Sequence, residues 1–241
     1  MLLSSWLLQA KEIRVAVAAN VSYAIEDLKK EFYKTHPETK IQVILGSSGK
    51  LTTQIKYGAP YEMFLSADMK FPTRLYEEKL AITKPVIYAQ GVLAILSIKE
   101  RNYCAEMYVF KDVDIKKIAI ANPKTAPYGE AAKEALENAK LYEKVKKKLV
   151  FAESAAQTLT YVRKAADIGI VAKSLLFTPQ LAHFKEAIHW AEVDERLYTP
   201  IDQGMVILKA GKGNAEVKAF YDFMLSAEAK KILISFGYRL D

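Results

Sequence analysis

Four short segments of the chain carry the residues whose types and spacing suggest chemistry. Each is rich in small, hydroxyl or amide residues, and each follows an apolar stretch with the pattern of a strand. Their uncharged hydrogen-bond donors suit the binding of a small anion better than acid–base or nucleophilic catalysis. The segments span residues 18–22, 46–49, 122–130 and 153–155.

Each of these segments also precedes a stretch with helical periodicity. After the first, the apolar residues Val21, Ile25, Leu28 and Phe32 recur at the spacing of one buried helix face. The first N–H groups of a helix have no acceptor within the helix, and the helix dipole places partial positive charge there. Several such helix starts at the carboxyl ends of neighbouring strands would converge on one anion-binding crevice.

The segment 46–50, with the sequence GSSGK, invites comparison with a nucleotide-binding P-loop. That motif requires a glycine where the chain has Ile44, and Ser or Thr where it has Leu51. A simpler anion loop fits better, because the glycines permit close approach and the serines supply donors. We expect Ser48 to bind the anion and Ser47 to cap the loop, with a ligand contact of Ser47 as the alternative.

The chain shows no convincing catalytic or metal-binding motif. His183, Glu186 and His189 would share one face if their stretch were helical, but no catalytic motif surrounds them. We interpret them as surface residues, and Asp68 as a cap or a contact between the lobes rather than a base. Since no nucleophile elbow, Cys–His pair or carboxylate pair is present, the sequence predicts a binding protein without a cofactor, not an enzyme.

The composition is typical of a soluble globular protein, with 51% hydrophobic and 26% charged residues among 241. The formal net charge is +7, but the lysines are scattered along predicted helix faces, as at 144–148. No basic motif with interleaved aromatic residues accompanies them, so we expect no nucleic-acid partner. The single cysteine, Cys104, excludes an intramolecular disulfide.

Residues 1–10 contain a short apolar run that ends at Ala10. The run is far too short to span a bilayer. We interpret it as the end of a secretory signal peptide cleaved after Ala10, and we therefore expect a periplasmic location. The positively charged start of such a signal is missing, so the alternatives are a misplaced start site or a frayed terminus.

The order of the predicted elements indicates an α/β protein with two similar lobes. From residue 13 to 68 the elements alternate as βαβαβ, which requires a parallel sheet with crossover helices. The alternation restarts near residue 116, after a long β-rich segment at 86–96. We predict two mostly parallel sheets with flanking helices, joined by two β crossovers, with lobe I at 12–88 and 203–241 and lobe II at 89–202.

Several motifs occur in a specific order along the chain, although each alone would be weak. They are AANVSYA at 18–24, GSSGKL at 46–51, GAPYEMFLSAD at 58–68, NP at 122–123 with PYG at 127–129, GIV at 169–171, and KAFYDF at 218–223. With this set, residues 12–241 resemble the periplasmic molybdate-binding proteins of ABC importers. The resemblance implies the type II periplasmic binding protein fold, in which neutral donors hold a tetrahedral oxyanion between the lobes.

The resemblance also implies which residues bind the oxyanion. They are Asn20 through its backbone N–H and side chain, Ser48 through its hydroxyl and backbone, and Tyr128 and Ala155 through their backbone N–H groups. The family commonly has a serine in place of Asn20, and in place of Ala172 a tyrosine whose hydroxyl binds the anion. The chain therefore lacks one donor. We expect the longer side chain of Asn20 to replace it, with Tyr128 as the less favoured substitute.

These observations predict an exported, monomeric binding protein that delivers its ligand to the permease subunit of an ABC importer. The predicted ligand is molybdate, and also tungstate, with little discrimination between these two similarly sized anions. Two alternatives stay open. One is a binder of another tetrahedral oxyanion such as sulfate, which the missing donor at Ala172 allows. The other is the ligand-sensing domain of a regulator, which uses the same fold.

Overall fold

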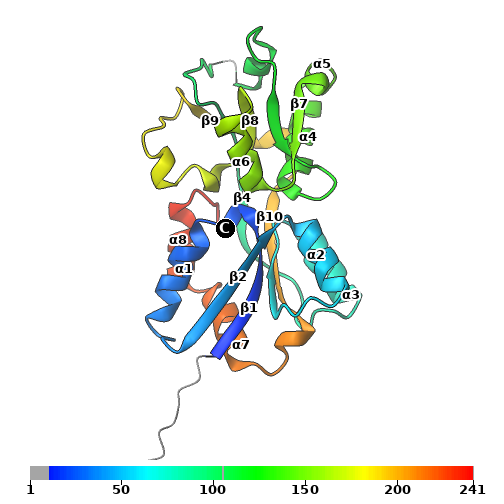
Figure 1. Ribbon diagram of the computed structural model, residues 1–241, viewed down its shortest axis with the longest axis vertical. Coiled ribbons are helices and arrows are strands. Elements are labelled where there is room, and N and C mark those ends of the chain that lie inside the picture. The colour runs from blue at the N-terminus through cyan, green and yellow to red at the C-terminus, as the bar shows by residue number, and fades with distance from the viewer. Residues whose placement is uncertain (1–10, 105, 241) are drawn as a thin grey trace, which may run out of the picture.

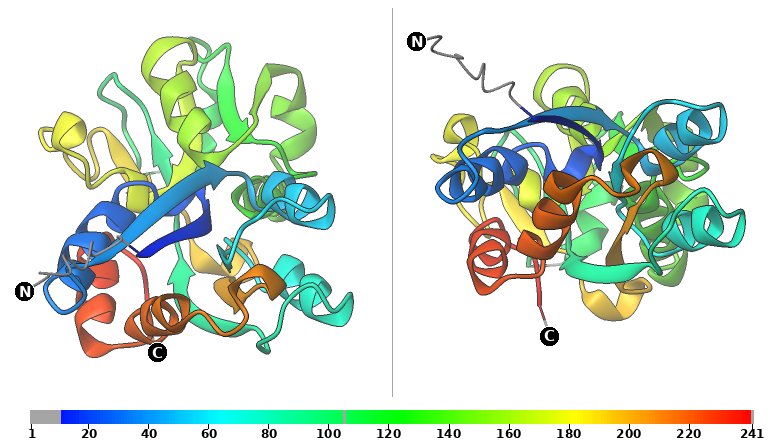
Figure 2. Two further views of the ribbon diagram at one scale, coloured as in Figure 1. Left: turned by 60° about the horizontal axis from the view of Figure 1, so that its bottom comes forward. Right: turned by 90° about the horizontal axis from the view of Figure 1, so that it is seen from below.

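The computed structural model describes residues 11–104 and 106–240, which form two lobes (Figure 1). Each lobe is built on a five-stranded sheet with helices packed around it (Figure 2). The predicted fold of two similar α/β lobes is therefore confirmed. The predicted secretory signal at residues 1–10 lies outside the described residues.

Lobe I contains the sheet with the strand order β2-β1-β3-β10-β4. Its first three strands are parallel, and β10 is antiparallel to both of its neighbours, so that β4 again runs in the direction of β1. The strands are β1 (Lys11–Ala18), β2 (Thr39–Gly46), β3 (Met63–Leu65), β4 (Val86–Gly91) and β10 (Ile201–Ile207). The helices are η1 (Ala19–Val21), α1 (Ala24–Tyr33), α2 (Ser48–Lys56), α3 (Lys70–Glu77), η7 (Lys209–Gly211), α7 (Ala215–Phe223) and α8 (Ala227–Ser235).

Lobe II repeats this plan with the strand order β7-β6-β8-β5-β9. Here β5 is the strand that is antiparallel to both neighbours. The strands are β5 (Leu93–Leu96), β6 (Ile118–Ala121), β7 (Leu149–Ala152), β8 (Ile168–Ala172) and β9 (Trp190–Glu192). The helices are α4 (Pro127–Asn138), α5 (Tyr142–Val145), α6 (Ala155–Lys164), η2 (Glu106–Lys111), η3 (Lys146–Lys148), η4 (Lys173–Leu175), η5 (Pro179–Leu181) and η6 (Glu195–Leu197).

The central strands are apolar on both faces because helices cover both sides of each sheet. In β1, Ile13, Val15 and Val17 belong to one hydrophobic cluster, and Ala16 belongs to a second cluster on the other side of the sheet. Burial on both faces accounts for the near-continuous apolar runs from which the strands were predicted. The parallel pairing of β1 with β2 and β3 places the carboxyl ends of these three strands together at one edge of the sheet.

The chain passes between the lobes twice. β4 of lobe I is followed by β5 of lobe II with only Val92 between them, and the chain returns from η6 of lobe II into β10. Both crossover strands lie at the junction of the lobes (Figure 1). The pairing register of β10 shifts between Gln203 and Gly204, a bulge that redirects the strand there. The lobe boundaries at residues 88/89 and 202/203 stay a prediction.

The helical region near the C-terminus is divided into two helices, α7 and α8. The break occurs because the Ser226 side chain caps α8 by accepting a hydrogen bond from the N–H of Ala229 at 3.2 Å. No helix among residues 11–104 and 106–240 is long and apolar enough to cross a membrane.

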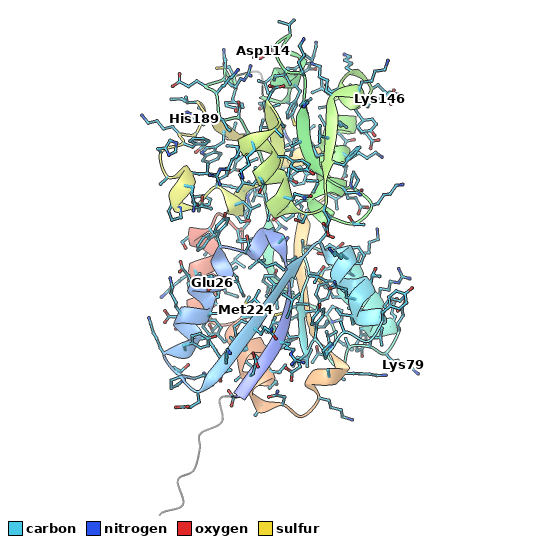
Figure 3. The ribbon with its side chains drawn as sticks, viewed as in Figure 1. Glu26, Lys79, Asp114, Lys146, His189 and Met224 are labelled. Atoms are coloured by element: carbon cyan, nitrogen blue, oxygen red, sulfur yellow. The ribbon has the colours of Figure 1, made fainter. Side chains whose placement is uncertain are left out.

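The stretch from His183 to His189 is not a helix, so its histidines do not share a helical face. The ring of His189 stacks on Phe184 instead, with ring centroids 4.6 Å apart. Within the described part of the chain, no group of three or more His, Cys, Asp or Glu residues could hold a metal ion. In Figure 3, His189, Asp114 and Lys146 all lie on the outer part of lobe II, away from the junction of the lobes.

Candidate anion-binding site

A small cavity lies between the lobes, where the predicted loops meet. Its volume is about 10 Å³, which is close to the minimum space that holds one water molecule. All four residues predicted to bind the oxyanion line this cavity, and so does Ser47. The full lining is Ala18, Ala19, Asn20, Gly46, Ser47, Ser48, Ala67, Ala126, Pro127, Tyr128 and Ala155.

Helix α2 brings Ser48 to the cavity as its first residue. The Ser48 hydroxyl oxygen accepts a hydrogen bond from the N–H of Ala67 at 2.9 Å, which leaves the hydroxyl proton available to an anion. The N–H of Ser48 belongs to the first turn of the helix, where no intrahelical acceptor exists. Ser48 can therefore present two donors to one ligand.

Ser47 occupies the N-cap position of α2 but does not form the hydrogen bond that a capping side chain makes. Its side chain makes no capping contact, and its hydroxyl oxygen is buried without a partner among the described residues. The prediction that Ser47 caps the loop is therefore wrong. A buried hydroxyl without a partner costs free energy, and a ligand oxygen in the cavity would satisfy it.

Helix α4 presents the backbone N–H of Tyr128. Pro127 occupies the first helical position and has no N–H, while Gly129 donates its own N–H to the carbonyl of Ala126 at 2.8 Å. Gly129 also permits close packing, because an added Cβ would lie 2.2 Å from the carbonyl oxygen of Ala121. The start of α4 thus offers the Tyr128 N–H as its free donor.

Helix α6 brings the N–H of Ala155 to the same cavity. Its cap is Ser154, whose side chain accepts a hydrogen bond from the N–H of Gln157 at 3.3 Å. This bond satisfies one first-turn donor and leaves the N–H of Ala155 without an intrahelical acceptor. Three helices, α2, α4 and α6, therefore begin at one small cavity and direct the positive ends of their dipoles toward it.

Asn20 lies in η1 at the end of β1, and its side chain does not act as predicted. The Nδ2 atom donates to Gln203 Oε1 and to Tyr238 Oη, both at 2.8 Å. Both amide hydrogens already have acceptors, so the prediction that this side chain replaces the missing donor is wrong. A contact of the Asn20 backbone N–H with the oxyanion stays a prediction.

Ala172 lies at the end of β8, where it pairs with Leu93, and it does not line the cavity. The hydroxyl that the family places at this position is therefore absent. The other predicted substitute, Tyr128, has a buried hydroxyl without a hydrogen-bond partner within the described structure. An added Cβ at Gly91 would lie 2.2 Å from this hydroxyl, which places it at the crossover strand β4.

The cavity is electrically neutral apart from its helix ends. None of its lining residues is a lysine, arginine, histidine or carboxylate, and burial raises the pKa of Tyr128 well above its ordinary value. Asp68 follows the lining residue Ala67 in the sequence, and its side chain accepts a hydrogen bond at 3.2 Å from the N–H of Phe71 in the first turn of α3. Burial raises the pKa of Asp68.

Several contacts between the lobes surround the cavity. The N–H of Gly49 in α2 donates to the carbonyl of Thr125, just before α4, at 2.9 Å. Lys50 and Glu153 form an ion pair at 2.5 Å, but both side chains are half exposed, so this pair adds little stability. The hydrogen bond between Gly49 and Thr125 holds the two backbones so close together that no side chain would fit at Gly49.

The sequence did not reveal four polar or small residues at the site. Ala67 lines the cavity, and Ser174, Gln203 and Tyr238 surround the Asn20 loop. Ala67 lies in the predicted strand-end segment 58–68, so its position gave a usable signal. The other three are distant in sequence and belong to no motif that marks a ligand site.

A model of the family described as bacterial extracellular solute-binding protein matches residues 13–239. The chain is 36% identical to the molybdate-binding protein ModA of Azotobacter vinelandii, over 96% of this chain and 91% of that protein. It is also 36% identical to ModA of Rhodobacter capsulatus, over 95% of this chain and 88% of that protein. The structure of the periplasmic molybdate-binding protein of A. vinelandii matches with a TM-score of 0.87 at 30% identity, covering 95% and 99% of the two chains.

Proposed function

The chain belongs to the bacterial extracellular solute-binding proteins, and from this premise we propose that it captures molybdate between its lobes and delivers it to the permease of an ABC importer. The predicted resemblance to the molybdate-binding proteins is confirmed by the relatives that carry this name. The observation that carries the proposal for the ligand is the small neutral cavity at which three helices begin.

The proposed contacts use only uncharged donors. The backbone N–H groups of Asn20, Tyr128 and Ala155 and both donors of Ser48 surround the anion, and the hydroxyl of Ser47 is a candidate for a further bond. Each helix start offers about half a positive charge, so three of them offset much of the charge of a dianion. Hydrogen bonds to an ionised oxygen are roughly twice as strong as neutral ones.

The same reasoning extends the proposal to tungstate, which has the shape and charge of molybdate. Sulfate has the same charge but a smaller radius, and donors held at a spacing set by the closed lobes would contact it less well. We propose that the protein is a periplasmic monomer without a cofactor, a catalytic activity or a nucleic-acid partner. The absence of a base beside Ser47 and Ser48 in the cavity supports a role in binding rather than catalysis.

Calorimetric titration with molybdate, tungstate, sulfate and phosphate tests this proposal. We expect molybdate and tungstate to bind with similar affinities, and sulfate and phosphate to bind at least about 100-fold more weakly, a difference of about 2.7 kcal/mol. Tight binding of sulfate with weak binding of molybdate would assign the protein to the alternative class of oxyanion. Heat signals indistinguishable from dilution for all four anions would refute an oxyanion-binding function.

The affinity should not depend on pH between about pH 6.5 and 9, where the oxyanion is fully deprotonated. Tyr128 is the one titratable side chain that lines the cavity, and its pKa is raised well above the ordinary value of a tyrosine. Its hydroxyl therefore stays neutral over this range, and no lining group gains or loses a proton. Titrations at several pH values check this expectation. A systematic loss of affinity with rising pH would indicate a titrating donor in the site.

A further inference from the structure

The orientation of the Asn20 side chain is determined by its neighbours. Gln203 Nε2 donates to the carbonyl oxygens of Ile201 at 3.0 Å and Ala67 at 3.3 Å, so Gln203 Oε1 is the atom that faces Asn20. An oxygen accepts hydrogen bonds, so Asn20 must present Nδ2 to it. Gln203 is fully buried, and no exchange with solvent competes for these bonds.

The backbone of Asn20 is held as firmly as its side chain. The Asn20 carbonyl oxygen accepts hydrogen bonds from Ser174 Oγ at 2.9 Å and from Tyr238 Oη at 3.1 Å. Tyr238 thus contacts Asn20 twice, once as donor to the carbonyl and once as acceptor from Nδ2. Its own position is fixed, because the next residue, Arg239, exchanges two backbone hydrogen bonds with Gln90 of β4.

These contacts join parts of the site that are separate in the fold. Gln203 connects Asn20 to the carbonyl of Ala67, and the N–H of Ala67 donates to the Ser48 hydroxyl. Ser174 lies in η4 of lobe II, whereas Tyr238 follows α8 of lobe I. Near the end of the described chain, Arg239 pairs with Gln90 of the crossover strand β4.

We propose that Gln203, Tyr238 and Ser174 are positioning residues that hold the Asn20 loop in its anion-binding geometry. Gln203 and Tyr238 pre-organise the loop within lobe I, whether or not the lobes are closed. Ser174 adds a bond from lobe II to the same carbonyl, so closure and the arrangement of the first binding loop are coupled at Asn20. Four hydrogen bonds hold Asn20, two from its Nδ2 and two to its carbonyl oxygen, while Oδ1 is buried without a partner in the described structure. A loop held by several buried hydrogen bonds is rigid, and rigid donor arrays bind with less loss of entropy.

This inference rests on the proposed function, because its main effect is on anion affinity. Tyr238→Phe removes both contacts of Tyr238 with Asn20 and leaves the ring in place. We expect the molybdate Kd to rise about tenfold or more, as for the loss of one or two hydrogen bonds beside a charged ligand. Ser174→Ala should raise the dissociation rate several-fold and leave the association rate unchanged, because its bond to Asn20 crosses between the lobes.

The matched control is Tyr103→Phe. Tyr103 is also a buried residue, and its hydroxyl donates to a backbone carbonyl, that of His189, at 2.7 Å, but it lies within lobe II and does not contact the Asn20 loop. We expect Tyr103→Phe to lower the melting temperature of the protein without changing its Kd for molybdate. If Tyr238→Phe and Tyr103→Phe have the same Kd as the parent, the positioning role of Tyr238 is refuted.

A ligand-free measurement separates this inference from the proposed function. The side-chain amide protons of Asn20, identified by their absence in the NMR spectrum of Asn20→Ala, should exchange slowly with solvent in the parent protein. Their exchange should accelerate at least about tenfold in Tyr238→Phe and stay unchanged in Tyr103→Phe. Rapid exchange in the parent would overturn the network even if molybdate binds. Slow exchange in a protein that binds no oxyanion would support the network and refute the proposed ligand.

Discussion

Ser48→Ala should weaken molybdate binding roughly 10- to 150-fold, which corresponds to about 1.5–3 kcal/mol for a hydrogen bond to a charged group. The hydroxyl of Ser48 has its acceptor site occupied by the N–H of Ala67, so its proton is available to the ligand. Alanine removes this donor and also leaves the Ala67 N–H without its partner. We therefore expect a lower melting temperature for the ligand-free variant as well. Calorimetric titration and thermal unfolding measure the two effects separately.

Thr53→Ala is the control for this experiment. Thr53 lies on the exposed face of α2, and its hydroxyl donates to the carbonyl of Gly49 at 2.9 Å rather than into the cavity. It should bind molybdate as the parent does. Ser47→Ala tests the neighbouring hydroxyl, which has no partner in the described structure. An unchanged affinity in Ser48→Ala together with a loss in Ser47→Ala would transfer the donor role to Ser47.

The gathering of the site residues could be predicted from the sequence because it depends on strand direction. The loops with Asn20 and Ser48 follow parallel neighbours, β1 and β2, and those with Tyr128 and Ala155 follow β6 and β7. The carboxyl ends of parallel strands meet at one edge of a sheet. A local pattern of strand, small residues and helix was therefore enough to bring these four residues to one cavity.

The directions of the side chains could not be predicted in this way. The partners of the Asn20 side chain, Gln203 and Tyr238, are 183 and 218 residues away in sequence. No local pattern records which atoms of a carboxamide a distant residue will engage. The different roles of the Ser47 and Ser48 hydroxyls could not be predicted either. The N–H of Ala67, rather than helix capping, determines how the Ser48 hydroxyl is used.

Gly49→Ala should weaken molybdate binding while leaving the ligand-free protein at least as stable as the parent. A Cβ at Gly49 would lie 2.9 Å from the carbonyl oxygen and 3.1 Å from the Cα of Thr125 in lobe II. Backbone atoms cannot give way as a flexible side chain can, so the lobes would have to close less completely. Overpacking of this kind costs about 1–3 kcal/mol, which corresponds to roughly a 5- to 150-fold loss of affinity.

Gly49→Ala is expected to lower the affinity for molybdate but to raise the stability of the ligand-free protein. This combination is specific to a defect in the closure of the lobes. Gly49 lies within α2 and has no positive φ, so alanine fits its backbone. Within lobe I the added Cβ would lie 3.2 Å from the tip of the Phe71 ring, a side chain that can shift, so alanine should stabilise the open, ligand-free protein by up to about 1 kcal/mol. A general defect of folding would lower both stability and affinity. Thermal unfolding without ligand and titration with molybdate distinguish these cases. Parental affinity in Gly49→Ala would mean that the contact between Gly49 and Thr125 does not form around the bound anion, and that the lobes need not close as far as they do in this structure.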